Sequence, residues 1–191
     1  MQLPTVKECQ ELYRFYHTPS NVQAHMLMVE RVAVWLAQQR QICGDPVNVP
    51  LVSAAAKLHD LVRIKDQWQY LPGDIKTPLQ HEEINYLVLN KQYPAVAAII
   101  RTHGLMTILK DGFANLEQKI VYYADKRVDH HTIVSLAERL RLGQQRWQIP
   151  PEQDCAAALL KHITNLEQTL FKGLAVQPNQ LREHVSNQIR L

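Results

Sequence analysis

Four side chains of the metal-ligand type follow one another along the chain: His25, the adjacent pair His59-Asp60, and Asp125. Imidazole and carboxylate without thiolate are typical of catalytic metal sites, which keep coordination positions open for water and substrate. Closed structural zinc sites use cysteine more often. Because an ion held in this way activates water, the pattern favours a hydrolase.

Two further histidines, His81 and His103, lie between the pair and the last aspartate, each in a segment with helical periodicity. Neighbouring positions on a helix point about 100° apart, so His59 and Asp60 splay from one turn. Both can still reach an ion that lies at a seam between helices. The six residues therefore require several helices that meet at one place.

Apolar residues recur with the helical period almost throughout the chain, whereas the alternation typical of strands is hard to find. The sequence therefore predicts an all-α protein with the fold of a helical bundle. Prolines, glycines and capping residues set the expected ends of the helices. We expect helices from Pro4 to about His17, from Ser20 to about Gly44, from Pro50 through His59-Asp60 to Val62, from Thr77-Pro78 through His81, from Pro94 to His103, from about Leu116 to Val128, from a capping Asp129 to Leu142, and from Pro150-Pro151 through Leu170. Loops are expected from Lys65 to Thr77, packed against the body, and around Asp111-Gly112.

Composition limits the classes of protein that fit. A chain of 191 residues with 46% hydrophobic residues has the size of one domain with its own core. The net charge of +3 gives no support to binding of nucleic acid. The three cysteines are far apart and form no CxxC pair, which favours a reducing cytoplasm. No apolar run is long enough to predict a membrane segment.

The residues around the ligands make the pattern specific. His25 lies in NVQAHMLMVERVA, His59-Asp60 in AAAKLHDLVR, and Asp125 in IVYYADKRVD. In order and flanking residues the chain resembles the HD-domain metal-dependent phosphohydrolases over roughly residues 20 to 145. The resemblance implies one domain over residues 1–191, with the C-terminal helices at 150–191 packed on the motif-bearing core.

The extra histidines, His81 in HEEINYLVL and His103 in IIRTHGL, resemble those of binuclear members of this family, which include hydrolases of symmetrical dinucleoside polyphosphates. That resemblance implies that Asp60 bridges two ions. One ion would also bind the other three ligands of the first set, and the second would bind the two extra histidines. The chain departs from the family where Ile84, Asn85 and Tyr86 replace an expected glycine. It also lacks the Gly-Tyr-Pro element of cyclic-dinucleotide phosphodiesterases, which disfavours that class.

The chemistry expected from such a site is hydrolysis of a phosphoester or phosphoanhydride, most naturally in a nucleotide, with one or two divalent ions. The ion would be iron, manganese, cobalt, nickel or zinc, with magnesium as a further option. Asp60 is the central catalytic ligand. Arg63 and Arg127 are candidate catalytic and phosphate-binding residues because a guanidinium grips phosphate with two donors, and Lys65 and Lys126 are further substrate-binding candidates.

Several alternatives remain open. A phosphomonoesterase that acts on nucleoside monophosphates would need a single metal. A catalytically silent module would bind metal and nucleotide without turnover, and a structural zinc site would have no open position.

Some individual residues also have two readings. The pair His130-His131 is expected at the surface, in the first turn of a helix. Arg139, Arg141 and Arg146 form either a basic rim or a solvated helix face. Trp68 anchors its loop or stacks a base. Apolar residues at the C-terminal end would permit a homodimer: Leu170, Phe171, Leu174 and Val176.

Overall fold

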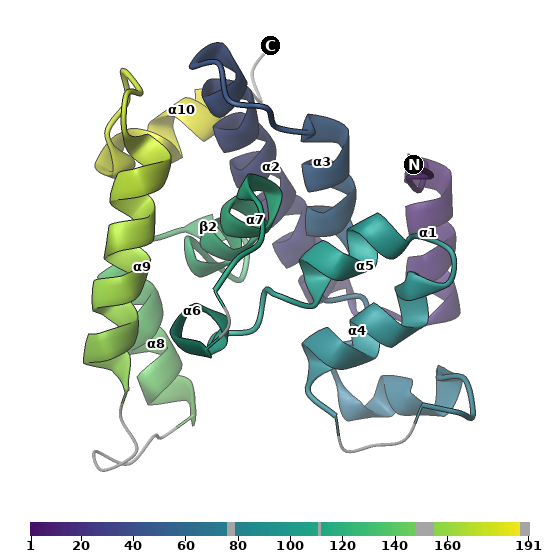
Figure 1. Cartoon of the computed structure of the whole chain (residues 1–191). Helices are drawn as coiled ribbons and strands as arrows, with labels where there is room; N and C mark the ends of the chain where they lie inside the picture. Colours follow the sequence, from purple (N-terminus) through teal and green to yellow (C-terminus); the bar gives the residue numbers. More distant parts are fainter. Residues whose placement is uncertain (76–78, 111, 148–154, 188–191) are drawn as a thin grey trace.

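The computed structural model describes residues 1–75, 79–110, 112–147 and 155–187, except for the side chain of Trp147. The regular secondary structure of the described residues is almost entirely helical, so the prediction of an all-α protein is confirmed (Figure 1). The helices are α1 (Val6–Phe15), α2 (Ser20–Ile42), α3 (Val49–Leu58), η1 (Lys65–Tyr70), α4 (His81–Asn90), α5 (Pro94–Ile100), α6 (Thr107–Lys110), α7 (Leu116–Lys126), α8 (Leu136–Trp147), α9 (Ala156–Phe171), η3 (Pro178–Gln180) and α10 (Leu181–Asn187). Strands β1 (Val128–Asp129) and β2 (Thr132–Ile133) form a short antiparallel hairpin.

The long helix α2 is central to the packing. It contacts α3, α7 and α10, and α3 in turn packs on α5 and α7. Along α2, Val29, Val32 and Leu36 are inaccessible to solvent. Buried apolar residues from Cys9 to Val185 form one core cluster. The helices that carry the ligand-type residues are thereby fixed relative to one another.

Capping residues explain where several helices begin. Asn48 caps α3 through its Oδ1, which accepts from the amide of Leu51 at 3.0 Å, and Pro50 lies in the first turn as predicted. Asn115 caps α7 in the same way, with 2.9 Å to the amide of Gln118. These two caps position the helices that lead to His59-Asp60 and to Asp125.

The predicted continuation of α3 through Val62 is wrong, because the helix ends at Leu58. The amide of Val62 donates to Oδ1 of Asn85 at 2.8 Å instead of to a helical carbonyl. His59 and Asp60 therefore lie in the turn that follows the helix. In a similar way α5 ends at Ile100, and His103 lies just beyond it.

The helix predicted after a capping Asp129 is also wrong, since residues 128–133 form the β1–β2 hairpin. Helix α8 begins later, where the hydroxyl of Ser135 accepts from the amide of Glu138 at 3.2 Å. It runs past Gly143 to Trp147.

The loop from Lys65 contains the short helix η1, and Trp68 is packed against the core there, as expected. The predicted helix starts at Thr77-Pro78 and Pro150-Pro151 lie outside the described residues, as does Asp111.

The C-terminal helices close over the core. Helix α9 packs against α7 and α8, and α10 packs against α2. Leu170, Phe171, Leu174 and Val176 are all buried by their own chain, so the apolar residues that would have permitted a homodimer are covered internally. Cys9, Cys43 and Cys155 are free thiols. Among the described residues, none of the helices has both the length and the apolar character needed to cross a membrane.

Candidate metal centre

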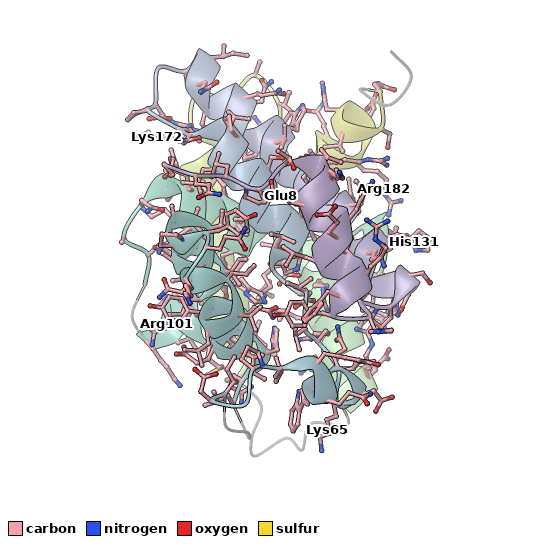
Figure 2. All side chains as sticks on the ribbon, turned by 90° about the vertical axis from the view of Figure 1, so that its right-hand side faces the viewer. Glu8, Lys65, Arg101, His131, Lys172 and Arg182 are labelled. Atoms are coloured by element: carbon pink, nitrogen blue, oxygen red, sulfur yellow. The ribbon has the colours of Figure 1, made fainter. Side chains whose placement is uncertain are left out.

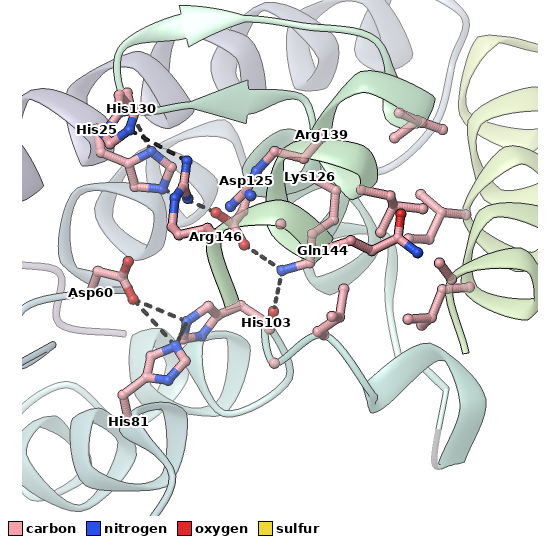
Figure 3. A pocket seen from close by; sticks show the side chains of 18 of the residues that line it. His25, Asp60, His81, His103, Asp125, Lys126, His130, Arg139, Gln144 and Arg146 are labelled. Carbon is pink, nitrogen blue, oxygen red and sulfur yellow. Dashed lines mark hydrogen bonds and ion pairs between the residues drawn. The ribbon is translucent and has the colours of Figure 1, made fainter. Parts of the chain in front are cut away.

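The structure brings all six ligand-type residues together from five parts of the chain. Figure 3 shows five of them, all except His59. His25 comes from α2, Asp125 from α7, and His81 from the first turn of α4. His59-Asp60 follows α3, and His103 follows α5. All of them except His59 line one pocket, and His59 is fully buried beside it.

His25, His59 and Asp125 form a first group. The Oδ1 atom of Asp125 lies 3.0 Å from Nε2 of His25 and 3.7 Å from Nε2 of His59. Ligand atoms bound about 2.1 Å from one ion lie roughly 3 to 3.5 Å apart at tetrahedral or octahedral angles. The three atoms are therefore spaced so that a single ion could be held between them.

Asp60, His81 and His103 form a second group. The Oδ1 atom of Asp60 lies 3.4 Å from Nε2 of His81 and 3.4 Å from Nε2 of His103. Its other oxygen, Oδ2, lies 3.7 Å from Nε2 of His59 in the first group. Asp60 thus presents one oxygen to each group, which is the geometry of a bridging carboxylate.

Hydrogen bonds to the protein backbone orient three of the imidazole rings. Nδ1 of His59 donates to the carbonyl of Ala56 at 2.8 Å, and Nδ1 of His103 donates to the carbonyl of Ile100 at 2.5 Å. Because a carbonyl oxygen only accepts, the proton of each neutral ring lies on Nδ1. The lone pair on Nε2 then points into the site, as a metal ligand requires.

His25 is oriented from the hairpin. Its Nδ1 donates to the carbonyl of His130 at 2.9 Å, across 105 positions of sequence. The Nδ1 atom of His81 instead faces the carboxylate of Glu82, with 3.1 Å to Oε2, in a geometry that falls short of a hydrogen bond. All four histidines thus have an oxygen beside Nδ1 and direct Nε2 inward.

Unpartnered polar atoms indicate that the site fits a cation. Among the described residues, Nε2 of His59 and Oδ1 of Asp60 are buried without a hydrogen-bond partner. A buried polar atom left in this state costs about 1 to 3 kcal/mol. Both atoms belong to the groups described above, so an ion bound there would satisfy them.

The charge states also suit metal binding. Burial opposes the charged form of Asp125, but Lys126 and the neighbouring histidines hold the pKa of its carboxyl well below the usual range. Burial likewise opposes the charged form of Asp60, but His59, His103 and Arg63 hold the pKa of its carboxyl well below the usual range. Burial, together with His103, lowers the pKa of His81 to about 2. The site therefore offers carboxylates and a neutral imidazole at neutral pH.

Two of the four predicted substrate-binding cations lie at the pocket. Lys126 is buried, and its ammonium donates to the carbonyl of His103 at 2.9 Å and to Oδ2 of Asp125. It therefore joins the two groups. Arg63 lines the pocket with its Nε 3.6 Å from Oδ2 of Asp60.

The structure does not bring Arg127 or Lys65 to the pocket. Arg127 is buried on the other side of α7, where it pairs with Glu167 at 2.8 Å and donates to Tyr123, Val134 and Pro178. These contacts give Arg127 a structural role in place of the phosphate-binding role that was predicted. Lys65 is exposed near Trp68, and Figure 2 shows it at the edge of the molecule. Trp68 packs against the core and is not among the residues that line the pocket.

Three supporting residues were missed by the sequence analysis. Asn85 is fully buried and holds the turn after His59-Asp60, since its side chain bonds both the amide and the carbonyl of Val62. It also donates to the carbonyl of His81 at 2.8 Å. Glu82 faces the ring of His81, and Gly104 leaves room for it, because a Cβ at Gly104 would lie 2.3 Å from Oε1 of Glu82. The sequence signal for Asn85 was its position among the apolar residues Ile84 and Leu89 of α4.

The hairpin and α8 complete the pocket. His130 is exposed, as expected, but adopts a positive φ of 52° that lets its carbonyl reach His25. Arg139 and Arg146 both reach Asp129, with 3.6 Å and 2.8 Å to its Oδ1. Both arginines line the pocket, which supports the basic-rim interpretation for them. Arg141 pairs with Glu138 on the solvated face of the helix.

Comparison with known proteins agrees with the motif. A family model described as HD domain matches residues 22–129, more than half of the chain. The matched segment contains all six ligand-type residues. No curated protein and no solved structure matches the chain.

Proposed function

The chain belongs to the HD domain family, and we propose that it is a metal-dependent phosphohydrolase that cleaves a phosphoester or phosphoanhydride bond in a nucleotide. The observation that supports this proposal most directly is the sharing of Asp60 between two groups of ligands at one pocket. A structural zinc site would be closed by its own ligands. Here the ligand atoms face a pocket large enough for a substrate.

The residues that would hold the ions are His25, His59 and Asp125 in the first group, and His81 and His103 in the second, with Asp60 between them. The ratio of imidazole to carboxylate favours a transition metal, since magnesium prefers oxygen ligands. When bound, such ions activate water for attack and neutralise the charge that builds on the phosphoryl oxygens.

The chain's own cations would bind and orient the phosphate. Arg63 can present its forked donors to two phosphate oxygens from the side of Asp60. The ammonium of Lys126 has three donors, of which two are directed to His103 and Asp125. Because it stands between the two groups, its remaining donor is suitably placed to contact the same phosphate.

The test is a hydrolysis screen on purified protein that has been stripped of metal and reloaded separately with manganese, iron, cobalt, nickel, zinc and magnesium. The substrates are nucleoside mono-, di- and triphosphates and dinucleoside polyphosphates, and ion-exchange chromatography separates the products. We expect hydrolysis of at least one substrate with at least one transition metal, and its loss in Asp60→Asn. Asp66→Asn, an exposed aspartate six positions later, is the matched control and should keep full activity. Full activity of Asp60→Asn, or no hydrolysis of any substrate with any ion, would contradict the proposal.

A further inference from the structure

The pocket extends well beyond the ligand-type residues. It has a volume of about 270 Å³ and reaches from the two ligand groups to the helices α8 and α9. Figure 3 shows the metal-ligand side chains on one side of the pocket and Gln144 on the side toward α9. The walls of this second part are aliphatic, with side chains from α8, α9 and the turn before α6: Leu105, Leu136, Leu140, Leu159 and Ile163. We call this part the α8–α9 recess.

Polar side chains border the α8–α9 recess. Gln144 lines it from α8, and Arg139 and Arg146 stand where the recess meets the ligand groups. The two guanidinium groups are held in place by Asp129 on the hairpin. The recess therefore combines apolar faces with an amide and two fixed cations at its border.

We infer that the α8–α9 recess is a subsite for the base of a nucleotide whose phosphate lies at the two ligand groups. A heteroaromatic base is apolar on both faces and polar along its edge, which matches leucine walls bordered by an amide and guanidinium groups. The inference rests on the proposed function for the position of the phosphate. Beyond the proposed function, it identifies the base as the part of the substrate that the protein recognises, and the residues of the recess as those that bind it.

Other organic groups fit the recess less well. A hydrocarbon chain would fill the apolar part but would bring no hydrogen-bonding group to the polar border of the recess. A sugar would pair with the polar border but would place hydroxyl groups against Leu140 and Leu159. The volume of about 270 Å³ lies just below the range of about 300 to 1,000 Å³ for ligand pockets, so it suits one nucleoside rather than two.

The test measures how much the base contributes to binding. The ligands are phosphonate analogues of AMP, GMP, CMP, UMP and ribose 5-phosphate, in which carbon replaces the ester oxygen and prevents cleavage. Their affinities for metal-loaded protein are measured by calorimetry. We expect at least one nucleotide analogue to bind about tenfold or more tightly than the ribose analogue. Equal affinity of all five would overturn the inference.

Variants of α8 show whether the recess is responsible for the preference for nucleotide analogues over the ribose analogue. Leu140 is only partly buried and lines the pocket, so Leu140→Ser should fold. It should remove most of the preference for the base while leaving the affinity of the ribose analogue unchanged. Leu142→Ser, on the same helix but outside the pocket lining, is the matched control and should keep the preference. A preference that persists in Leu140→Ser would also overturn the inference.

The outcomes separate this inference from the proposed function. If the protein releases no phosphate but prefers nucleotide analogues through Leu140, the base subsite stands and the hydrolase fails. If it releases phosphate from ribose 5-phosphate and from nucleotides equally well, the hydrolase stands and the base subsite fails. Tighter binding of an octyl phosphonate than of every nucleotide analogue would show that the recess takes hydrocarbon, and would reject the nucleobase.

Discussion

The Nε2 atoms of His81 and His103 face one another at 2.9 Å. The proton of His103 lies on Nδ1, where the carbonyl of Ile100 accepts it. Without a metal ion, Nε2 of His81 can carry the proton of its ring and donate it to the lone pair of His103. A cation bound together with Asp60 would take the place of this proton and bind both Nε2 atoms, which would link α4 to the segment after α5.

Removal of metal should therefore destabilise the folded protein. An ion present at 100 times its dissociation constant stabilises the native state by about 2.7 kcal/mol. For a chain of this size that corresponds to about 5 to 10 °C in the melting temperature. The measurement is thermal unfolding before and after treatment with a chelator and after metal is added back. An unchanged melting temperature would argue against a bound ion.

The two ligand groups should lose metal separately. His25→Ala removes a ligand of the first group only, and His81→Ala removes a ligand of the second only. Each variant should keep about one ion per chain after dialysis, whereas Asp60→Asn should weaken both sites. Metal analysis by mass spectrometry gives the count. Loss of all metal from both single variants would show that the groups do not act as two sites.

The carboxylate of Glu82 should tune the second group. Glu82→Gln removes the charge beside Nδ1 of His81, and changes of this kind cost about 10- to 100-fold in metal affinity. Glu83→Gln is the matched control on the same helix, because Glu83 pairs with Arg101 away from the pocket. Competition with a chromophoric chelator measures both variants. Equal metal affinities of Glu82→Gln and Glu83→Gln would show that Glu82 does not support the second group.

Asn85 should be essential for the turn that carries His59 and Asp60. Asn85→Leu keeps a similar volume but leaves the amide and carbonyl of Val62 buried without their partners. Because each such group costs about 1 to 3 kcal/mol, we expect a loss of about 2 to 6 kcal/mol in the free energy of unfolding. Urea denaturation of the metal-free protein measures it. Asn90→Leu, at the partly exposed end of the same helix, should cost much less.

Substitution of Arg127 should affect the stability of the fold, whereas substitution of Arg63 should affect substrate binding. Arg127→Met takes the positive charge away from the carboxylate of Glu167, which keeps the hydroxyl of Tyr123, and should destabilise the fold by about 3 to 5 kcal/mol. Its kcat/KM, measured well below the melting temperature, should stay near that of the wild type. Arg63→Met should do the reverse, with a reduced kcat/KM and nearly unchanged stability. A large loss of kcat/KM in Arg127→Met would restore the predicted role in phosphate binding.

The ligand set was predictable because its signal is local. Each ligand stands in a short stretch with recognisable neighbours, and the helical period around it is strong. The structure accordingly brings His25, His59 and Asp125 together, as well as Asp60, His81 and His103.

Other features depended on partners far away in the chain. The end of α3 is decided by Asn85, which takes the amide of Val62 from 23 positions away. Arg127 turns from the pocket because Glu167 lies on α9, 40 positions later. The two-residue strands at Val128–Asp129 and Thr132–Ile133 are too short to show alternation. None of these contacts leaves a pattern within its own segment.

The contact between His25 and the hairpin has a consequence for how this protein can vary. His130 holds the imidazole through its main-chain oxygen, and its side chain is exposed. Substitution there should be tolerated wherever the residue accepts a positive φ, as glycine and asparagine do, and resisted for β-branched residues. An insertion or deletion between Asp129 and Thr132 would move the oxygen itself. Across related chains, the length of this turn should therefore vary less than its amino-acid sequence.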